Sequence, residues 1–151
     1  TTVVVLMLDQ ATKMVYASTG SGGSWRVEII PGFLEFIHRM PNQHGVFGLG
    51  PGTPIFYMVA TLGGLGLIAY FLINMRPGHL SPHLGLGLLC GGALGNLIDR
   101  MVFSAVRDFI KMAFWPFVYN VADAAICAGV VFLLFEAFTA EELDKKRVEA
   151  P

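Results

Sequence analysis

Charged residues are scarce in this sequence: they make up 14% of its 151 residues, whereas hydrophobic residues make up 54%. Because a soluble domain of this size carries about 25% charged residues, the shortage argues against a soluble globular protein and for an integral membrane protein. The formal net charge is only −1, which gives no reason to expect nucleic acid as a partner. Cysteine is also scarce. Cys90 and Cys127 both lie in apolar runs, which argues against a disulfide framework and favours packing in apolar surroundings.

Long apolar segments dominate the rest of the sequence. A helix needs about 20 apolar residues to cross a bilayer, at about 1.5 Å per residue. Residues 54–74 carry no charge, residues 80–98 carry none apart from a histidine, and the last segment is apolar but for one aspartate until Glu136. The sequence therefore predicts an all-α membrane protein with four transmembrane helices, at about residues 1–18, 54–74, 80–103 and 114–138.

The first predicted helix is short in the sequence as given. Residues 1–8 are apolar but too few to span a membrane alone, so we expect the helix to continue to about residue 18. Because the sequence lacks an initiator Met and begins within this helix, we expect further residues upstream. No separate signal peptide is visible.

Residues 19–53, between the first two helices, have a different composition. Within them, WRVEIIPGFLEFIHRM alternates well enough for two short strands, with Pro31–Gly32 as the turn between them. We therefore predict a small β-sheet on the membrane surface, between the first two helices. Residues 139–151 are predicted to form a solvated polar tail, and residues 1–151 together a single membrane-embedded domain.

Four helices would bring both termini to one side of the membrane, and the sheet with the 104–113 connection to the other. Cytoplasmic loops normally carry the excess of Lys and Arg, but here the excess falls on the sheet side. The sheet-side cations are Lys13, Arg26, Arg39, Arg100, Arg107 and Lys111, against Arg76, Lys145, Lys146 and Arg147 on the other side. Either the topology is inverted, or several of these cations belong to a site.

Acidic residues in or near the predicted helices also indicate a site. An ionised side chain within a membrane helix costs about 2.5–3.5 kcal/mol. Nevertheless Asp9, Asp99 and Asp123 lie within or near the ends of predicted helices, and Asp108 follows the third helix. All four lie toward the sheet end, so we expect them to converge just inside one membrane face.

The spacing of the polar residues supports this convergence, because residues at i, i+3 and i+4 share one face of a helix. Three groups have this spacing: Asp9 with Lys13, Asn96 with Asp99 and Arg100, and Asn120 with Asp123. Glycines directly precede the second group, and small residues allow membrane helices to approach closely.

Simpler explanations remain open for several of these charges. Asp99–Arg100 is equally compatible with an interfacial ion pair, and Asp9–Lys13 with a structural pair. Arg107 is expected to be solvated or to contact lipid headgroups.

Asp123 favours a functional role, because twelve apolar or small residues follow it without a balancing charge. The histidines are weaker candidates. His79 and His83 have the i, i+4 spacing of metal ligands, but Pro82 lies between them and no acidic or thiol partner is near in the sequence. We therefore predict no metal site.

Five blocks of the sequence resemble those of the lipoprotein signal peptidase (signal peptidase II) family. They occur in the family's order and at suitable separations. The blocks are DQATK (9–13), NQHGVFGL (42–49), GGALGNLIDR (91–100), VRDFI (106–110) and YNVADAAI (119–126). The second block departs from the family pattern, since its glycine stands three residues after Asn42, at Gly45, with His44 in the usual place.

The resemblance implies an enzyme that cleaves a diacylglyceryl-modified prolipoprotein just before its lipidated cysteine. It implies Asp108 and Asp123 as the catalytic aspartates. Substrate-binding or supporting roles are implied for Asp9, Lys13, Asn42, Gly92, Asn96, Asp99, Arg100, Asn120 and Ala122. We expect no cofactor, a monomer, and membrane lipid and the prolipoprotein as partners. The resemblance also implies a multi-pass protein of the bacterial inner membrane, with cytoplasmic termini, an extracytoplasmic β-sheet between helices 1 and 2, and an active site near the outer face.

The chemistry of the residues agrees with this assignment. Two carboxylates that share one proton can hydrolyse a peptide bond without a metal, one as base to water while the other polarises the carbonyl. The residues alone do not select Asp108 over Asp99 as the partner of Asp123, because a cation adjoins each of them: Arg107 and Arg100 respectively.

A function of another class is also compatible with an acid in a membrane helix. A small four-helix transporter would use Asp123 as a proton-coupled counter-ion to its substrate. It predicts inverted repeats or broken helices in corresponding halves of the chain, and the sequence contains neither.

Overall fold

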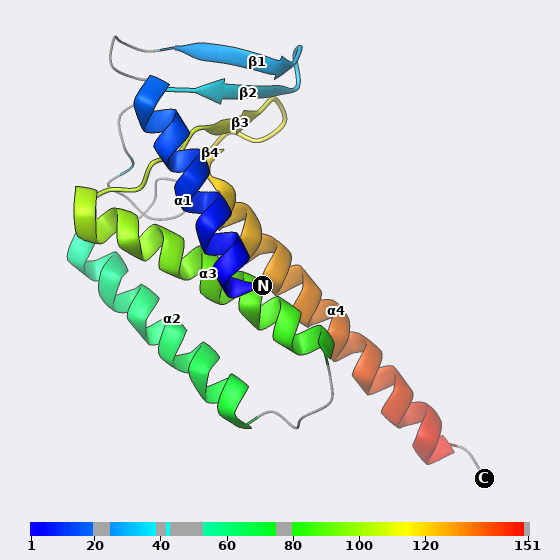
Figure 1. Ribbon diagram of the computed structural model, residues 1–151. Helices are drawn as coiled ribbons and strands as arrows, with labels where there is room; N and C mark the ends of the chain where they lie inside the picture. The colour runs from blue at the N-terminus through cyan, green and yellow to red at the C-terminus, as the bar shows by residue number, and fades with distance from the viewer. Residues whose placement is uncertain (20–24, 39–41, 43–52, 75–79, 150–151) are drawn as a thin grey trace.

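The computed structural model describes residues 1–19, 25–38, 42, 53–74 and 80–149, and combines four helices with a four-stranded sheet (Figure 1). The helices are α1 (Thr2–Thr19), α2 (Pro54–Asn74), α3 (Leu80–Phe103) and α4 (Val121–Glu149). The strands are β1 (Arg26–Ile30), β2 (Leu34–Ile37), β3 (Ile110–Met112) and β4 (Val118–Tyr119).

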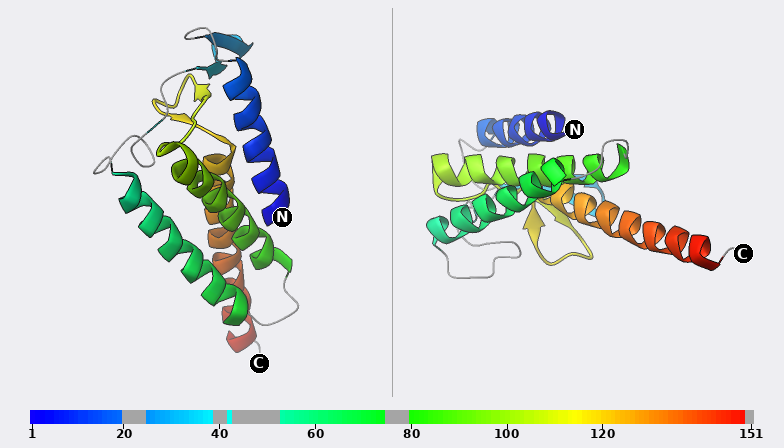
Figure 2. Two further views of the ribbon diagram at one scale, coloured as in Figure 1. Left: turned by 60° about the vertical axis from the view of Figure 1, so that its left-hand side comes forward. Right: turned by 90° about the horizontal axis from the view of Figure 1, so that it is seen from below.

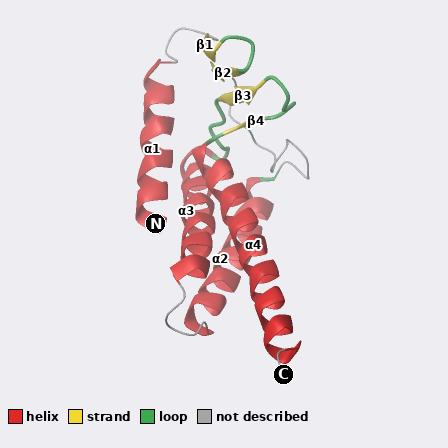
Figure 3. Cartoon of the chain, turned by 90° about the vertical axis from the view of Figure 1, so that its right-hand side faces the viewer, coloured by secondary structure: helices red, strands yellow, loops and turns green. Residues whose placement is uncertain are grey.

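Helix α3 lies at the centre of the helical part. It packs along α4 and also contacts α1 and α2, which lie on opposite sides of it (Figure 2). The sheet lies at the end of the bundle where α1 and α3 finish and where α2 and α4 begin (Figure 3). The polar residues of the sequence blocks are therefore gathered beneath the sheet.

The sheet is antiparallel, with the strand order β1-β2-β3-β4. The predicted hairpin over β1 and β2 is confirmed, including its turn: Gly32 has a φ of 68°, and the Phe33 amide donates to the Ile30 carbonyl at 2.9 Å. Glycine suits this position because it adopts positive φ without a steric cost.

The prediction that the sheet lies only between the first two helices is wrong. β3 and β4 come from the segment after α3, and β2 pairs with β3. The fourth helix was predicted from residue 114, but α4 begins at Val121. The physical reason is that Pro116 lies in a stretch rich in aromatic residues, which favours extended backbone and turns over a regular helix.

The segment predicted as a polar tail is helical over residues 139–149, because α4 continues to Glu149. This segment is rich in Glu, Leu, Lys and Arg, which have high helix propensity, and it contains no glycine before its end. By contrast, the bounds predicted for the second and third helices agree with α2 and α3.

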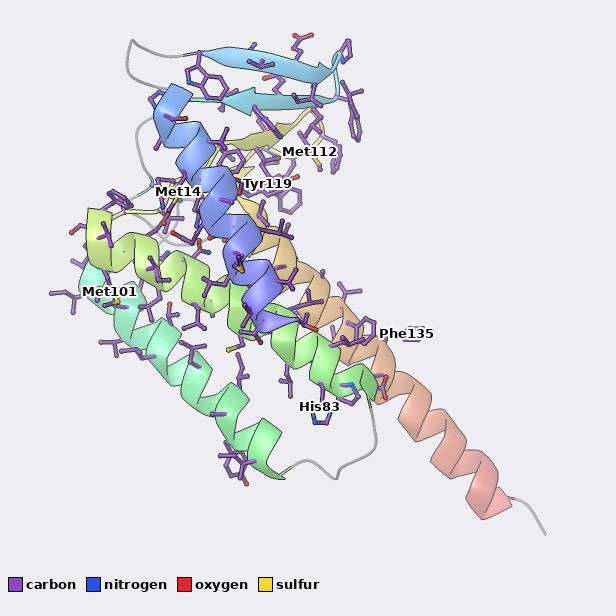
Figure 4. The ribbon with its side chains drawn as sticks, viewed as in Figure 1. Met14, His83, Met101, Met112, Tyr119 and Phe135 are labelled. Atoms are coloured by element: carbon purple, nitrogen blue, oxygen red, sulfur yellow. The ribbon has the colours of Figure 1, made fainter. Side chains whose placement is uncertain are left out.

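Apolar side chains cover the outer surfaces of the helices. Met14, Met101 and Phe135 point away from the bundle (Figure 4) and are each at least 65% exposed. Within the described residues, one helix is long and apolar enough to cross a membrane, over Pro82–Phe103, and a shorter apolar stretch covers Pro54–Tyr70. The four predicted helices are present, whereas the crossing of a membrane by all four stays a prediction.

Candidate active site

The amino end of α4 is built by reciprocal capping between Asn120 and Asp123. The Asp123 amide donates to Asn120 Oδ1 at 3.0 Å, and the Asn120 amide donates to Asp123 Oδ2 at 3.3 Å. This arrangement is a capping box, in which two residues three apart satisfy each other's backbone donors. A third donor of this helix end, the Ala122 amide, is bound by Asp9 Oδ1 at 3.0 Å. The local structure thus fixes the Asp123 carboxylate at the start of α4.

A left-handed turn after α3 presents the next residues of the site. Ser104 has a φ of 55°, and its amide donates to the Arg100 carbonyl at 3.0 Å, which ends the helix. The chain then runs extended, so that successive side chains point to opposite sides. Val106 pairs with Asn42 through two backbone hydrogen bonds of 2.7 and 2.8 Å. Arg107 and Asp108 consequently face different surroundings.

Asp108 and Asp123 are both held by asparagine amides. Asp108 accepts hydrogen bonds from Asn42 Nδ2 at 2.9 Å and from Asn120 Nδ2 at 2.7 Å. Asp123 Oδ1 accepts one from Asn96 Nδ2 at 2.8 Å. Together with the cap to Asp123 Oδ2, each of the four carboxylate oxygens has an N–H donor. Neither side chain can rotate without losing these bonds.

Both aspartates line one cavity of about 260 Å³ beneath the sheet. Its wall is largely apolar and comes from β3, β4 and the segment between them, where Met112 and Tyr119 lie above the start of α4 (Figure 4). The other lining residues are Asn42, Asn96, Arg100, Val106, Phe114, Trp115, Phe117, Val118, Ala124 and Cys127. An apolar chain with one polar bond at its end would fit such a cavity.

Burial and, to a lesser extent, the neighbouring charge of Asp123 together raise the pKa of the Asp108 carboxyl from 3.8 to about 6. The amides of Asn42 and Asn120 act in the opposite direction, because they stabilise the ionised form. The balance leaves Asp108 able to hold a proton at mildly acidic pH.

This raised pKa predicts a pH-dependent stability. The folded state binds more protons than the unfolded state between pH 3.8 and about 6, so stability is highest below pH 3.8 and is lost as the pH rises through 6. We expect a loss of roughly 3 kcal/mol in the wild type relative to Asp108→Asn, at about 1.36 kcal/mol per pKa unit. Thermal midpoints of both proteins in detergent, measured from pH 4 to pH 7, test this. Parallel curves for the two proteins would contradict it.

A closed ion cluster lies between α1, α3 and the segment after α3. Lys13 Nζ contacts Asp9 Oδ2 at 2.9 Å and Asp99 Oδ2 at 3.3 Å, and all three side chains are fully buried. Arg107 binds Asp99 through Nη2–Oδ1 at 2.6 Å and Nε–Oδ2 at 3.2 Å, in a bidentate pair. The predicted Asp9–Lys13 pair is confirmed. The cluster sets two cations against two carboxylates and is formally neutral.

Two of the simpler expectations are wrong. Arg107 is neither solvated nor at a lipid surface, because it is only 8% exposed and is bound to Asp99. Within the described residues, Asp99 pairs with Lys13 and Arg107 and not with its neighbour Arg100. The Arg100 guanidinium lies 5.2 Å from the centre of the Tyr57 ring and lines the cavity. The helical spacing correctly placed Asn96 beside Arg100. It did not predict the partners of Asp99, which come from α1 and from the segment after α3.

Two glycines of α3 allow this close assembly. A Cβ at Gly92 would overlap the Ala122 carbonyl oxygen, and a Cβ at Gly95 would overlap the Asp9 carboxylate. Any larger residue would push α4 and α1 away from α3 and open the hydrogen bonds of the site. Gly92 and Ala122 therefore lie at the α3–α4 contact, and Ala122 is completely buried.

The buried cations account for the unusual charge distribution along the sequence. Lys13 and Arg107 belong to the ion cluster, and Arg100 lines the cavity. These three of the sheet-side cations are thus part of a site, which favours the second of the two explanations given for the excess. They should be left out when loop charges are used to assign orientation.

Some site residues were not singled out from the sequence. Gln10 donates to Asp9 Oδ2 at 3.0 Å and accepts from Arg107 Nη2 at 3.3 Å. Tyr57 reaches Arg100 from α2, which nothing in the local sequence suggests. The different surroundings of Arg107 and Asp108 could have been predicted from the sequence, because neighbouring side chains in an extended segment point to opposite sides. His44, Gly45 and His79 lie outside the described residues.

Within the described part of the chain, no group of three His, Cys, Asp or Glu side chains is suited to hold a metal ion. The polar residues that line the cavity include Asp108, Asp123, Asn42, Asn96 and Arg100.

Comparisons with known proteins agree along nearly the whole chain. The sequence model of the family described as Signal peptidase (SPase) II matches residues 1–139. The lipoprotein signal peptidase of Staphylococcus carnosus is 37% identical over 137 residues, covering 88% of this chain and 84% of that protein. The lipoprotein signal peptidase of Listeria monocytogenes (serotype 4b, strain CLIP80459) is 31% identical over 147 residues, covering 95% and 94%.

A solved structure is similar as well. It is a bacterial membrane enzyme determined by the in meso method at 2.3 Å resolution, with a TM-score of 0.82 and 32% identity, covering 91% of this chain and 85% of that one. Sequence and fold thus give the same answer, and the chain belongs to the signal peptidase II family of lipoprotein-processing membrane peptidases.

Proposed function

We propose that the protein is an aspartic endopeptidase that removes the signal peptide from diacylglyceryl-modified prolipoproteins by cleaving just before the lipidated cysteine. The observation that carries this proposal is the pair Asp108 and Asp123, which face one cavity with every carboxylate oxygen bound by an N–H donor. Two carboxylates held in this way can hydrolyse a peptide bond without a metal and without a covalent intermediate.

In this mechanism the pair carries one proton and titrates as a unit. The ionised aspartate takes a proton from water, whose oxygen attacks the scissile carbonyl carbon, while the other aspartate gives its proton to the carbonyl oxygen. The tetrahedral diol then collapses. The C–N bond breaks, the first aspartate passes its proton to the leaving nitrogen, and one diol proton returns to the second aspartate. Both residues end in their starting states.

The amides and Arg100 would support these steps. Asn42, Asn96 and Asn120 hold the carboxylates at fixed positions, so that little reorganisation is needed during reaction. Arg100 lies on the cavity wall without an ion pair to Asp99, where it would bind the carbonyl groups of the substrate. The apolar wall from β3 and β4 would receive the hydrophobic residues of the signal peptide.

The membrane arrangement is part of the same proposal. All four helices would span the bacterial inner membrane as one domain, with both termini cytoplasmic and the sheet at the outer face. The exposed apolar side chains on α1, α2 and α4 support this arrangement, because they would face lipid. The protein would act as a monomer, with membrane lipid and the prolipoprotein as its partners.

A second cavity of about 320 Å³, between α2, α3 and α4, would hold an acyl chain of the substrate. Its walls are mostly apolar and include Ala60, Gly64 and Ile126, and it shares Asn96 and Arg100 with the cavity of the aspartates. Because the two cavities adjoin at these shared residues, the lipid would lie in an apolar groove while the bond next to the modified cysteine reaches Asp108 and Asp123.

Ala60→Phe is therefore expected to raise KM for a diacylated peptide by roughly tenfold, because the ring fills the groove that an acyl chain would occupy. The effect should decrease when the acyl chains of the substrate are shortened. Val59→Phe is the matched control, since Val59 is exposed and lies outside both cavities. Equal KM values for the two variants would contradict this location of the lipid.

The proposed function is tested by incubating the wild type, in detergent, with a diacylated prolipoprotein peptide and its unlipidated counterpart. We expect cleavage of the diacylated peptide only, with mass spectrometry placing the cut just before the modified cysteine. Cleavage elsewhere, or equal cleavage of both peptides, would contradict the proposed specificity. Absence of cleavage together with proton-driven transport in vesicles would favour a transporter.

A further inference from the structure

Lys13 occupies a position that an ion pair alone does not explain. Its ammonium group is fully buried and contacts three oxygens: Asp9 Oδ2 at 2.9 Å, Asn96 Oδ1 at 3.1 Å and Asp99 Oδ2 at 3.3 Å. An ammonium group has three hydrogens and no acceptor, so each hydrogen has one oxygen. The contacts with Asp9 and Asp99 belong to the ion cluster. The contact with Asn96 connects Lys13 to the proposed catalytic pair Asp108 and Asp123 (the dyad), because Asn96 also bonds to Asp123.

The contact to Asn96 determines which way its amide faces. Asn96 Oδ1 accepts from Lys13 Nζ, and also from Asn120 Nδ2 at 3.1 Å. Asn96 Nδ2 is thereby turned to Asp123 Oδ1, to which it donates at 2.8 Å. If the partner of Asn96 were a neutral amide, it could bond to either end of the Asn96 side chain. An ammonium group can only donate, so it bonds only when the Asn96 oxygen faces it.

Lys13 is the stronger of the two groups that orient this amide. Its hydrogen bond is charge-assisted, and such bonds are about twice as strong as neutral ones. Asn120 Nδ2 is neutral: one of its two N–H groups donates to Asn96 Oδ1 and the other to Asp108 Oδ1 at 2.7 Å, so neither bond has the added strength of a charge.

We propose that Lys13 is a positioning residue for catalysis: it fixes the Asn96 amide so that its N–H faces Asp123, and thereby keeps one carboxylate of the dyad ionised. The inference rests on the proposed function. Without Lys13, Asn96 can present Oδ1 to Asp123, and that contact is a hydrogen bond only when the Asp123 carboxyl carries a proton. Asp123 and Asp108 would then both be protonated, and neither could take a proton from water.

The other charges around the dyad do not replace this effect. Asp99 and Arg107 belong to the ion cluster. Together with Asp9 and Lys13 they form a group whose formal charges cancel. Arg100 approaches from α3 and binds the Asn96 carbonyl at 3.3 Å, not its side chain. Tyr57 from α2 contacts Arg100. Among the described residues, Lys13 is thus the cation whose side chain bonds to the Asn96 side chain, which in turn bonds to Asp123.

The test compares Asp9→Asn/Lys13→Met with Asp9→Asn alone. The double variant removes the cation together with one carboxylate, so that Asp99 and Arg107 remain balanced, whereas the single variant keeps Lys13 on Asn96. We expect the double variant to lower kcat about tenfold at neutral pH, with KM within about twofold, and to move the acidic limb of the pH–rate profile up by about one unit. The single variant is the reference for both changes, because it carries the same substitution at residue 9 and keeps Lys13. Asp9→Asn/Lys13→Gln is a second form of the double variant, should the methionine form fail to fold.

Infrared spectroscopy gives a readout that needs no substrate. The band of protonated carboxyl groups, assigned by its loss in Asp108→Asn and Asp123→Asn, should persist to higher pH in the double variant. A shifted band without any cleavage by the wild type would refute the proposed peptidase specificity but support the positioning role. The inference would be overturned by a folded double variant whose acidic limb and carboxyl band lie at the same pH as in the wild type. A raised KM as the only change would also overturn it.

Discussion

Asp108→Asn and Asp123→Asn are each expected to lower kcat by about 100- to 10,000-fold while the protein remains folded. Each substitution removes the acidic group that either takes a proton from water or gives one to the carbonyl oxygen, and such groups contribute about 100- to 10,000-fold each. An asparagine has nearly the same shape, so the packing around the cavity should be preserved. Cleavage of the diacylated peptide is measured for each variant, with its thermal midpoint as the check on folding.

Asp99→Asn is the informative comparison, because sequence reasoning left Asp99 open as the partner of Asp123. Asp99 is fully buried in the ion cluster and is not among the residues that line the cavity. We therefore expect this variant to lose stability and to keep measurable turnover at reduced temperature. Turnover by Asp108→Asn, with a folded but inactive Asp99→Asn, would make Asp99 the partner.

The helices were predictable where a long apolar run is interrupted by turn residues. Pro54–Asn74 and Leu80–Phe103 agree with their predicted bounds for this reason. The start of α4 was not predictable from hydropathy, because residues 114–119 are as apolar as a membrane helix but form a turn and β4. The signal that marks the helix start is the cap at Asn120, whose side chain binds the amide of Asp123.

The candidate site was partly predictable for a similar reason. Local spacing identified Asp9 with Lys13, and Asn120 with Asp123, because helical neighbours are fixed by the sequence itself. Contacts between distant segments carry no such local signal. The bond from Arg107 to the Lys13 carbonyl joins residues 94 apart in the sequence. Only the fold brings these two groups together.

The ion cluster predicts the largest effect on stability. Arg107→Met is expected to lower the free energy of unfolding by about 3–5 kcal/mol, because it leaves Asp99 buried without its bidentate partner. Arg107→Lys should lose less, since an ammonium restores the charge but not the paired hydrogen bonds. Unfolding of each variant in mixed detergent micelles gives these differences.

A double-mutant cycle separates the loss of the ion pair from a general loss of packing. Asp99→Asn/Arg107→Met removes both charges, and replacing a whole buried pair is far less costly than breaking it. The double variant should therefore be more stable than Arg107→Met alone, even though it differs from the wild type at one more buried position. If the two losses simply add, Arg107 acts through its contacts with Phe103 and the α1 backbone and not through Asp99. Restored stability would instead mean that Arg107 acts through its ion pair with Asp99, within the neutral cluster of α1, α3 and the segment after α3.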